Sequence, residues 1–253
     1  MLQPGVPGDV LACAVAGEVA EPDVLPAVLP GVGVSPGAHA PHAPPPRPAR
    51  MIAYASRTGT RRNLAALREA GWRLIVTPVC LRSEGFRYAL DNGAWSAHRR
   101  GLQWDADAFV RALVKLGMHA DFVVLPDIVG QGTASLKRSR TWLPIVSGYT
   151  GRCLVPVQNG VDPAEVRALL SERVGLFVGG DTTWKLATLG YWGRMAHEAG
   201  CYLHVGRVNT ARRIRRVESA GAHSFDGTSV TRYAETLRAL EEARQQRGFR
   251  LYA

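Results

Sequence analysis

The chain has 253 residues, of which 46% are hydrophobic, and it carries a formal net charge of +10 at pH 7. That length and composition suffice for one sizeable core or two small ones. No stretch approaches the roughly 20 consecutive apolar residues that a bilayer span requires, which excludes a membrane-spanning protein and predicts a soluble, cytoplasmic one with no membrane partner.

The first fifty residues differ in composition from the rest. They contain 11 of the 16 prolines and no Trp, Tyr or Phe, so they offer little to bury, and we predict a disordered, flexible leader over residues 1–50. Glu18 interrupts the apolar run "VLACAVAGEVA", which argues against a targeting signal. Met51 opens the patterned region and is an alternative start of the protein, so we expect one folded domain over residues 51–253.

Four cysteines are spread along the chain without any CxxC pair: Cys13, Cys80, Cys153 and Cys201. This spacing argues against a zinc site and favours reduced thiols in a cytoplasm. Cys153 and Cys201 open apolar runs, where a small buried residue is the simplest role. We therefore expect no metal and no cofactor.

Eight short apolar runs follow the leader, most of them closed by Gly, Asp or Asn. In chain order they are MIAYAS (51–56), WRLIVT (72–77), RYALDNG (87–93), DFVVLPD (121–127), CLVPVQNG (153–160), VGLFVGG (174–180), CYLHVG (201–206) and AHSFDG (222–227). They are rich in Val, Leu and aromatic residues and too short for helices. These features are typical of strands that are buried on both faces.

Helix-like segments separate most of these strands, at residues 105–117, 163–172, 184–199 and 210–220. Helix starts are indicated at Asp162-Pro163 and Thr210, and helix ends at Gly71, Gly117, Gly200 and Gly221. Eight strands that alternate with helices predict an α/β fold, a compact (β/α)8 TIM barrel at the lower end of its usual size. The segment 78–86 is short for a crossover helix, which leaves a doubly wound open sheet as the alternative.

Either fold places functional residues at the carboxyl ends of the strands. The residues at those ends include Asp91, Asp127, Gln158, Gly179, Gly180, Arg207 and Asp226. A single aspartate there is often only a helix cap or a turn residue, and Asp226 could cap a helix that begins near Val230. Three acids, an amide and a Gly-Gly pair on one rim favour a functional site.

Residues 51–253 carry a net charge of +12, because the leader contributes −2. The basic residues cluster as RTGTRR (57–62), HRR (98–100), KRSR (137–140), RRIRR (212–216) and RQQRGFR (244–250). Any one cluster could be only a solvated helix face. The summed excess, dominated by arginine, predicts a polyanionic partner.

Six motifs carry a resemblance to a known family. LDNGAWS, LPDIVG, VPVQNG, FVGGDTTWK, YLHVGRVNTARRI and SFDGTSVTRY occur in the order and with roughly the spacing of motifs in the tRNA-guanine transglycosylase superfamily. The chain resembles most closely the short phage DNA transglycosylases of the DpdA type, which place 7-deazaguanines in DNA. The resemblance covers most of residues 51–233.

The resemblance implies roles for two acids. Asp226 aligns with the aspartate nucleophile that attacks C1′ of the target nucleoside, and Asp91 with the carboxylate that acts as acid and base on the departing and arriving bases. A carboxylate can trap the cationic sugar through which base exchange passes. On this view Gly227 leaves room for the sugar to approach.

It also implies residues that bind the base. Asp127 matches the acid that reads the N1 and 2-amino edge of guanine. Gln158 and Gly180, within the Gly179-Gly180 pair, match the donors to O6. Trp95 would stack on the base, although a role as a core tryptophan remains an alternative.

The chain departs from the tRNA enzymes in lacking their C-terminal CxCxxC zinc site and in having "LDNGAWS" where they have "DSGGFQ". These differences favour DNA. We therefore expect an enzyme that exchanges guanine in DNA for a preQ0-like 7-deazaguanine base, with the target nucleotide flipped or single-stranded. The expected nucleic-acid contacts are Arg207, Arg212, Arg213, Arg215, Arg216 and Arg232.

Three alternatives remain open: a tRNA-guanine transglycosylase, a non-catalytic basic barrel that binds nucleic acid, and a barrel enzyme for small phosphorylated metabolites. A pure polyanion binder gains nothing from three converging carboxylates. The metabolite enzyme would use "DGTSVTR" as its phosphate loop, with Arg232 on the phosphate.

Overall fold

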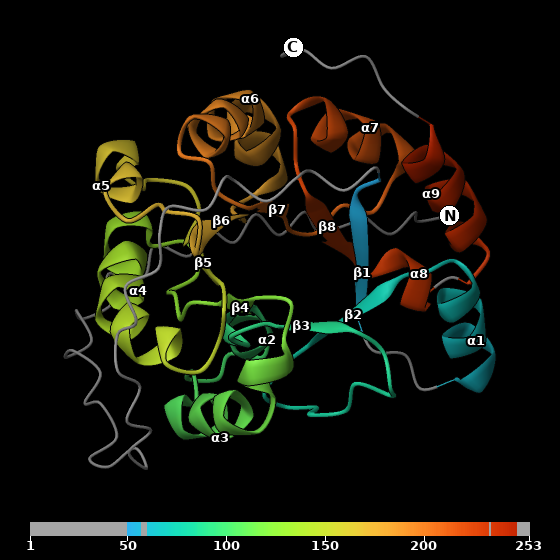
Figure 1. The fold of residues 1–253 in the computed structure, drawn as a ribbon, viewed down its shortest axis with the longest axis horizontal. Helices are drawn as coiled ribbons and strands as arrows, with labels where there is room; N and C mark the ends of the chain where they lie inside the picture. Colours follow the sequence, from blue (N-terminus) through green and yellow to red (C-terminus); the bar gives the residue numbers. More distant parts are fainter. Residues whose placement is uncertain (1–49, 57–59, 233, 247–253) are drawn as a thin grey trace, which may run out of the picture. The chain divides into compact units, whose positions relative to one another are not determined.

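The computed structural model describes residues 50–56, 60–232 and 234–246. The described residues leave out almost all of the predicted leader. They also leave out residues 57–59 of the RTGTRR cluster and the C-terminal residues 247–253. The described part of the chain forms one ring of strands surrounded by helices (Figure 1).

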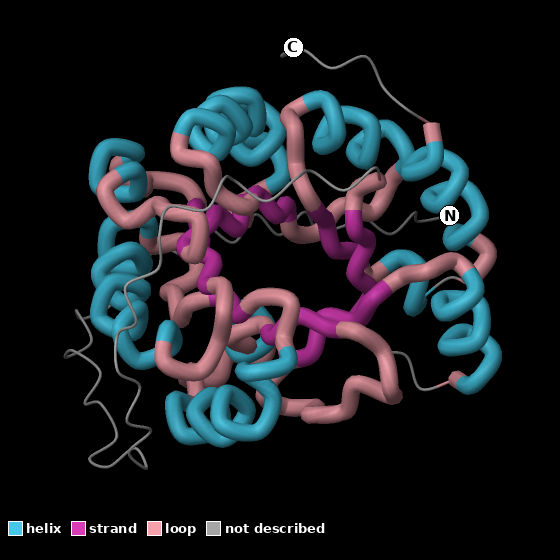
Figure 2. The backbone as a smooth tube through the Cα atoms, viewed as in Figure 1, coloured by secondary structure: helices cyan, strands magenta, loops and turns pink. Residues whose placement is uncertain are grey.

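Eight parallel strands close into a barrel in sequence order. They are β1 (Ile52–Ser56), β2 (Arg73–Val76), β3 (Tyr88–Leu90), β4 (Val123–Val124), β5 (Cys153–Val157), β6 (Val174–Val178), β7 (Leu203–Val205) and β8 (Ser224–Gly227). β1 pairs with β8 as well as with β2, which closes the ring that Figure 2 shows. The predicted TIM barrel is confirmed. The alternative of an open sheet is wrong, because β1 and β8, which would be its first and last strands, pair with each other.

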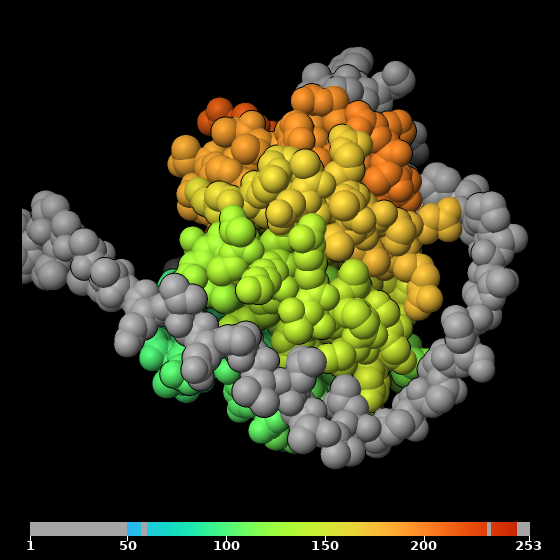
Figure 3. All heavy atoms as spheres, turned by 90° about the vertical axis from the view of Figure 1, so that its left-hand side faces the viewer, coloured from blue at the N-terminus to red at the C-terminus, as the bar shows by residue number. Residues whose placement is uncertain are grey.

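Most of the helices cover the outside of the ring (Figure 1). The helices are α1 (Arg61–Glu69), α2 (Ala94–Arg99), α3 (Ala106–Leu116), the 3-10 turn η1 (Gly117–His119), α4 (Gly132–Ser147), α5 (Pro163–Arg167), α6 (Thr182–Glu198), α7 (Ala211–Ser219), α8 (Ser229–Arg232) and α9 (Thr236–Gln245). Figure 3 shows the part of the wall that α4 to α6 form.

Local signals place several helix ends. The side chains of Asp162 and Thr210 accept hydrogen bonds from amides in the first turns of α5 and α7, as predicted. Asp105 caps α3 in the same way. The predicted helix 163–172 is shorter than expected, since α5 ends at Arg167 and is followed by turns.

The connection from β2 to β3 contains no helix, and all its residues, 77–87, are described. An isolated antiparallel bridge between Thr77 and Cys80 folds it back on itself. β2 and β3 remain parallel neighbours. Segment 78–86, which was short for a crossover helix, is therefore a loop without a helix. It nevertheless returns the chain to the amino end of the barrel, where β3 begins.

Two apolar layers follow from the alternation of side chains along each strand. The side chains inside the barrel include Tyr54, Ile75, Ala89, Phe122, Val124, Leu154 and Tyr202. The larger layer, between strands and helices, includes Phe109, Trp142 and Phe225. Because Phe225 lies in this outer layer against Trp72, its neighbours Ser224 and Asp226 point into the barrel.

Cys153 and Cys201 are buried free thiols, in line with the role as small buried residues. Within the described ranges, no helix combines the length and apolarity that a membrane crossing requires.

Candidate active site at the carboxyl ends of the strands

The predicted site residues gather at one mouth of the barrel. Asp91, Asp127 and Gln158 directly follow or lie just beyond β3, β4 and β5, and Gly179, Gly180 and Arg207 follow β6 and β7. Asp226 is the third residue of β8, and Trp95 lies in the first turn of α2. All strands run in one direction, so these positions share the carboxyl end of the barrel.

Asp91 lies close enough to Asp226 and Asp127 for their negative charges to affect its pKa. Burial raises the pKa of Asp91 to about 7, and the charges of Asp226 and then Asp127 add to the rise. A carboxyl group with a pKa near 7 can both donate and accept a proton under ordinary conditions. Asp91, after β3, therefore lies near both Asp127, after β4, and Asp226 in β8.

The carboxylate of Asp127 is held by two side-chain amides. Asn92 Nδ2 donates to its Oδ1 at 2.8 Å, and Gln158 Nε2, whose two hydrogens are shared among three acceptors, lies 3.2 Å from its Oδ2. Burial raises the pKa of Asp127 to about 6, and the hydrogen bond from Asn92 opposes this rise most strongly. Asp127 therefore presents a fixed pair of oxygens to the mouth.

The amide of Gln158 is already used within the protein. Its Nε2 also donates to Ile128 O at 2.8 Å and to Ser135 Oγ at 2.7 Å, and its Oε1 accepts from Gly130 N at 2.7 Å. Gln158 is buried. In this structure it positions Asp127 and the following loop, and a direct contact with a base would require breaking one of these bonds.

Asp226 is buried, with a side-chain exposure of 10%. Its Oδ1 accepts hydrogen bonds from the backbone N–H of Arg207 at 3.0 Å and from His204 Nε2 at 3.2 Å. The first amides near α8, at Thr228 and Ser229, donate instead to the side chain of Asn209, at 2.8 and 3.1 Å. Asn209 therefore caps this helix, and the carboxylate of Asp226 is oriented toward β7.

One peptide unit orients Asp226. The N–H of the Gly206–Arg207 peptide donates to Asp226, and the carbonyl of the same peptide accepts from Lys185 Nζ. Lys185 is buried; burial lowers its pKa to about 8, with a further lowering by the charge of Arg207. A buried ammonium thus holds the peptide that holds the carboxylate.

Arg207 adopts a left-handed backbone with φ of 57°, one of two non-glycine residues in the described ranges with positive φ. This conformation costs a side-chain-bearing residue roughly 1–2 kcal/mol. Its guanidinium donates to Gly180 O and lies 4.2 Å from the ring centroid of Trp95. Arg207 therefore joins the strand-end loops of β6 and β7 to α2.

Trp95 is 40% exposed, so it is not a core residue. Its ring stacks on Arg207 and lies 5.8 Å from the ring of His98 at an interplanar angle of 28°. The alternative of a core tryptophan is not supported. The ring lies at the rim, where a flat ligand could reach it.

His204 connects Asp226 to the barrel interior. Its Nδ1 lies 2.7 Å from Ser224 Oγ, and its ring stacks on Phe177 at 4.8 Å between centroids. Burial lowers the pKa of His204, so the ring is neutral at pH 7. The tautomer with hydrogen on Nε2 suits both partners, since it donates to the Asp226 carboxylate and accepts from the Ser224 hydroxyl.

Two glycines near Asp226 are closely packed, and a side chain at either position would meet a neighbour. A Cβ on Gly206 would lie 2.8 Å from the Phe177 ring and 3.2 Å from Asp226 Oδ1, and one on Gly227 would lie 2.6 Å from Val208 O. The space beside Gly227 is therefore filled by the chain after β7. The expectation that this glycine leaves room for a sugar is replaced by a packing role.

Helix α7, which follows the carboxyl end of β7, carries four arginines. Arg212, Arg215 and Arg216 are exposed, and Arg213 is partly exposed. The charge of Arg213 contributes to the lowering of the pKa of Arg207, after burial, so Arg213 lies close to Arg207. The side chain of Arg232, in α8, lies outside what the structure describes.

A cavity of about 260 Å³ opens on the same face, between the ends of β1 and β2 and helix α2, lined among others by Ser56, Thr77 and Ser96. No cluster of three or more His, Cys, Asp or Glu side chains in the described ranges is arranged to hold a metal ion.

No protein-family model matches the chain, and neither does any curated protein. Among solved structures, it is similar to a native KDPGal structure, with 12% identity and a TM-score of 0.45 over 76% of this chain and 93% of that one. It is also similar to a dihydropteroate synthetase with a product, with 9% identity and a TM-score of 0.46 over 78% and 96%. At such identities the likeness concerns the fold, and it identifies no substrate.

Proposed function

We propose that the chain is a nucleic-acid guanine transglycosylase that exchanges guanine, most readily in DNA, for a 7-deazaguanine base such as preQ0. The observation that carries the proposal is the group of three carboxylates at the mouth of the barrel. Asp226 is held by two donors, and Asp91 has a pKa near 7 because of burial and of its two acidic neighbours. Carboxylates in such different surroundings suit different steps of one reaction.

The exchange would take two steps. An oxygen of Asp226 forms a bond to C1′ as the C1′–N9 bond of the target nucleotide breaks, and the departing guanine takes the proton of Asp91. The incoming base then gives its N9 proton back to Asp91 as its nitrogen attacks C1′, and the carboxylate of Asp226 leaves. Bonds and protons balance over the cycle, so no cofactor is required.

Other residues of the mouth would bind the base and the polymer. Asp127 presents two oriented oxygens, which suit the N1–H and 2-amino donors of a guanine edge. Trp95 offers an exposed ring for stacking. The exposed arginines of α7 supply charge for phosphates beside the site.

The test is base exchange by the purified protein. The protein is incubated with labelled guanine or preQ0 and with single-stranded DNA, duplex DNA or tRNA. The polymer is then digested, and its nucleosides are analysed by mass spectrometry. We expect incorporation into DNA by the wild type and a loss of at least about a hundredfold in Asp226→Asn.

Asp181→Ser is the matched control, because Asp181 is also a strand-end acid but caps α6 through Trp184 N at 2.9 Å. Serine can retain that cap, so this variant should keep near wild-type exchange. Incorporation into tRNA alone would mean that the substrate is tRNA and not DNA. Absence of exchange in all three polymers by a folded protein would contradict the proposed function.

A further inference from the structure

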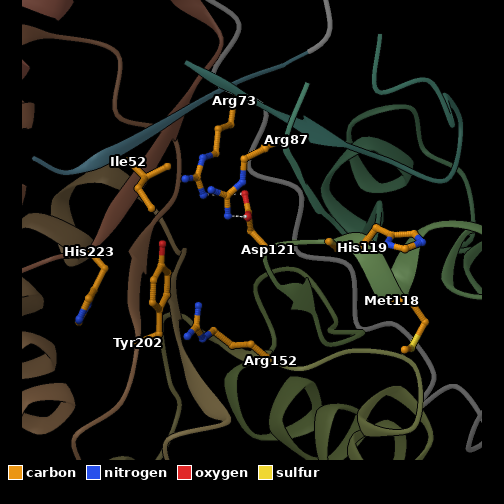
Figure 4. Close-up of a pocket in the computed structure, with 10 residues that line it drawn as sticks. Ile52, Arg73, Arg87, Met118, His119, Asp121, Arg152, Tyr202 and His223 are labelled. Atoms are coloured by element: carbon orange, nitrogen blue, oxygen red, sulfur yellow. Dashed lines mark hydrogen bonds and ion pairs between the residues drawn. The ribbon is translucent and has the colours of Figure 1, made fainter. Parts of the chain in front are cut away.

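A second cavity lies at the opposite mouth of the barrel and has a volume of about 440 Å³. Its lining residues stand at the amino ends of the strands. Arg73 opens β2, Arg87 and Arg152 directly precede β3 and β5, and Tyr202 directly precedes β7. Parallel strands place this cavity at the other end of the barrel from Asp226. Figure 4 shows its side chains.

The lining carries more positive than negative charge. Arg73 Nη1 lies 2.9 Å from Asp121 Oδ2, and Arg87 Nη2 lies 2.8 Å from Asp121 Oδ1. Tyr54 donates to the same carboxylate at 3.0 Å. Asp121 is the single acid in this lining and already serves two arginines, while Arg152 adds a third guanidinium. The three arginines and the one aspartate leave the lining with a net formal charge of +2.

Arg152 has an unmet hydrogen-bonding requirement. Its Nε is buried and has no hydrogen-bond partner among the described residues. Its guanidinium carbon lies 4.5 Å from the ring centroid of Tyr202, and that ring stacks in turn on His223 at 4.8 Å. The aromatic stack holds the guanidinium in place but accepts none of its hydrogens. A buried N–H without an acceptor is unfavourable, and an anionic oxygen bound beside the guanidinium could supply one.

We propose that this cavity binds a small molecule that bears a phosphate group. Phosphate suits the site because a guanidinium can donate two parallel hydrogen bonds to its oxygens. Arg87 is 70% exposed on its side chain and can turn toward a ligand without leaving a buried gap. The cavity volume is within the usual range for small-molecule sites. The proposal uses none of the residues of the candidate active site and does not depend on the proposed function.

The test is calorimetric titration with orthophosphate and with ribose 5-phosphate at constant ionic strength. The wild type should bind at least one of them saturably, at one site per chain. Arg87→Gln and Arg152→Gln should each weaken that binding by about tenfold, the usual effect of losing one charge-assisted hydrogen bond. Arg111→Gln, at an exposed position of α3, should leave it unchanged.

Thermal unfolding of each variant accompanies the titration. If Arg152→Gln does not fold, Arg87→Gln decides the question, since its exposed side chain has little part in packing. Absence of saturable binding of both probes would overturn the proposal, as would equal affinity in the wild type and the decisive variants. Binding of a short oligodeoxynucleotide alone, weakened by Arg87→Gln, would assign the arginines to a polymer backbone and would also overturn it.

Discussion

The backbone N–H of Arg207 donates a hydrogen bond of 3.0 Å to the carboxylate of Asp226, and it does so from a left-handed conformation with φ of 57°. A strained residue beside a buried acid is a feature that recurs at functional sites, where surrounding contacts maintain it. Here the contacts are those of the Arg207 side chain with Gly180 and Trp95 and the contact of Lys185 with the preceding carbonyl.

The strain at position 207 can be measured with a pair of variants. Arg207→Gly and Arg207→Ala both lose the guanidinium contacts, but only glycine adopts positive φ without a steric cost. We expect Arg207→Gly to be more stable than Arg207→Ala by about 1 kcal/mol in urea unfolding. Equal stabilities, or a more stable alanine variant, would show that position 207 is not strained.

The raised pKa of Asp91 predicts a pH dependence of stability. Asp91 titrates near 3.8 when unfolded and at about 7 when folded, so the folded state binds more protons between these values. The free energy of unfolding should therefore fall as the pH rises from about 4 to about 7. Asp127, raised to about 6, adds to the fall in the lower part of this range.

Asp91→Asn removes the contribution of Asp91 to the pH dependence of the free energy of unfolding. The variant should match the wild type in stability below pH 4 and exceed it above pH 7, by roughly 1–3 kcal/mol because water still reaches the partly exposed side chain. Urea unfolding at both pH values measures this. If the free energy of unfolding of the variant and of the wild type changed with pH in parallel, Asp91 would not be the source of the pH dependence.

Lys185 should act as a positioning residue for Asp226. Lys185→Met keeps much of the side-chain volume but no longer holds the Gly206 carbonyl. We expect a loss of stability of roughly 1–3 kcal/mol and a fall in kcat of about tenfold, with KM for DNA little changed. Lys115→Met, at an exposed position of α3, is the control. A fall confined to KM would instead place Lys185 in substrate binding.

The arginines of α7 should set the salt dependence of DNA binding. Each phosphate contact contributes roughly 0.9 to the slope of log K against log salt concentration on duplex DNA. Replacing Arg212, Arg213, Arg215 and Arg216 by alanine should therefore lower the slope by about 1 to 4. Replacing Arg111 and Lys115 on α3, which removes half as many positive charges, shows how much of the change a lower net charge alone produces. An unchanged slope would mean that the α7 arginines only solvate the helix.

The strands and the strand-end acids could be predicted because their signals are local. Each strand is a short apolar run, and Asp91, Asp127 and Asp226 stand where such a run stops. Their number and order predicted a barrel, but the short segment 78–86 left an open sheet as the alternative, and the pairing of β1 with β8 decided between them. The shortness of α5 could not be foreseen, since the turns after Arg167 interrupt a segment whose composition suits a helix.

The residues that support the acids were missed because their roles depend on distant contacts. His204 lies 22 positions from Asp226, and Lys185 lies 21 from Gly206. Weak signals did exist. His204 is a polar residue in a buried strand. Lys185 falls on the buried face of α6 with Leu189 and Trp192, at helical spacing. The saturation of Gln158 by protein partners had no sequence signal.

The most direct measurement of the central claim is the detection of a covalent intermediate. The wild type and Asp226→Asn are incubated with a guanine-containing oligodeoxynucleotide without an acceptor base and then analysed by denaturing electrophoresis and intact mass. We predict a denaturant-resistant adduct on the peptide with Asp226 in the wild type, none in Asp226→Asn although it folds and binds DNA, and a reduced amount in Asp91→Ala. An adduct in Asp226→Asn, or wild-type turnover by that variant, would contradict the account and make Asp91 the next nucleophile to test.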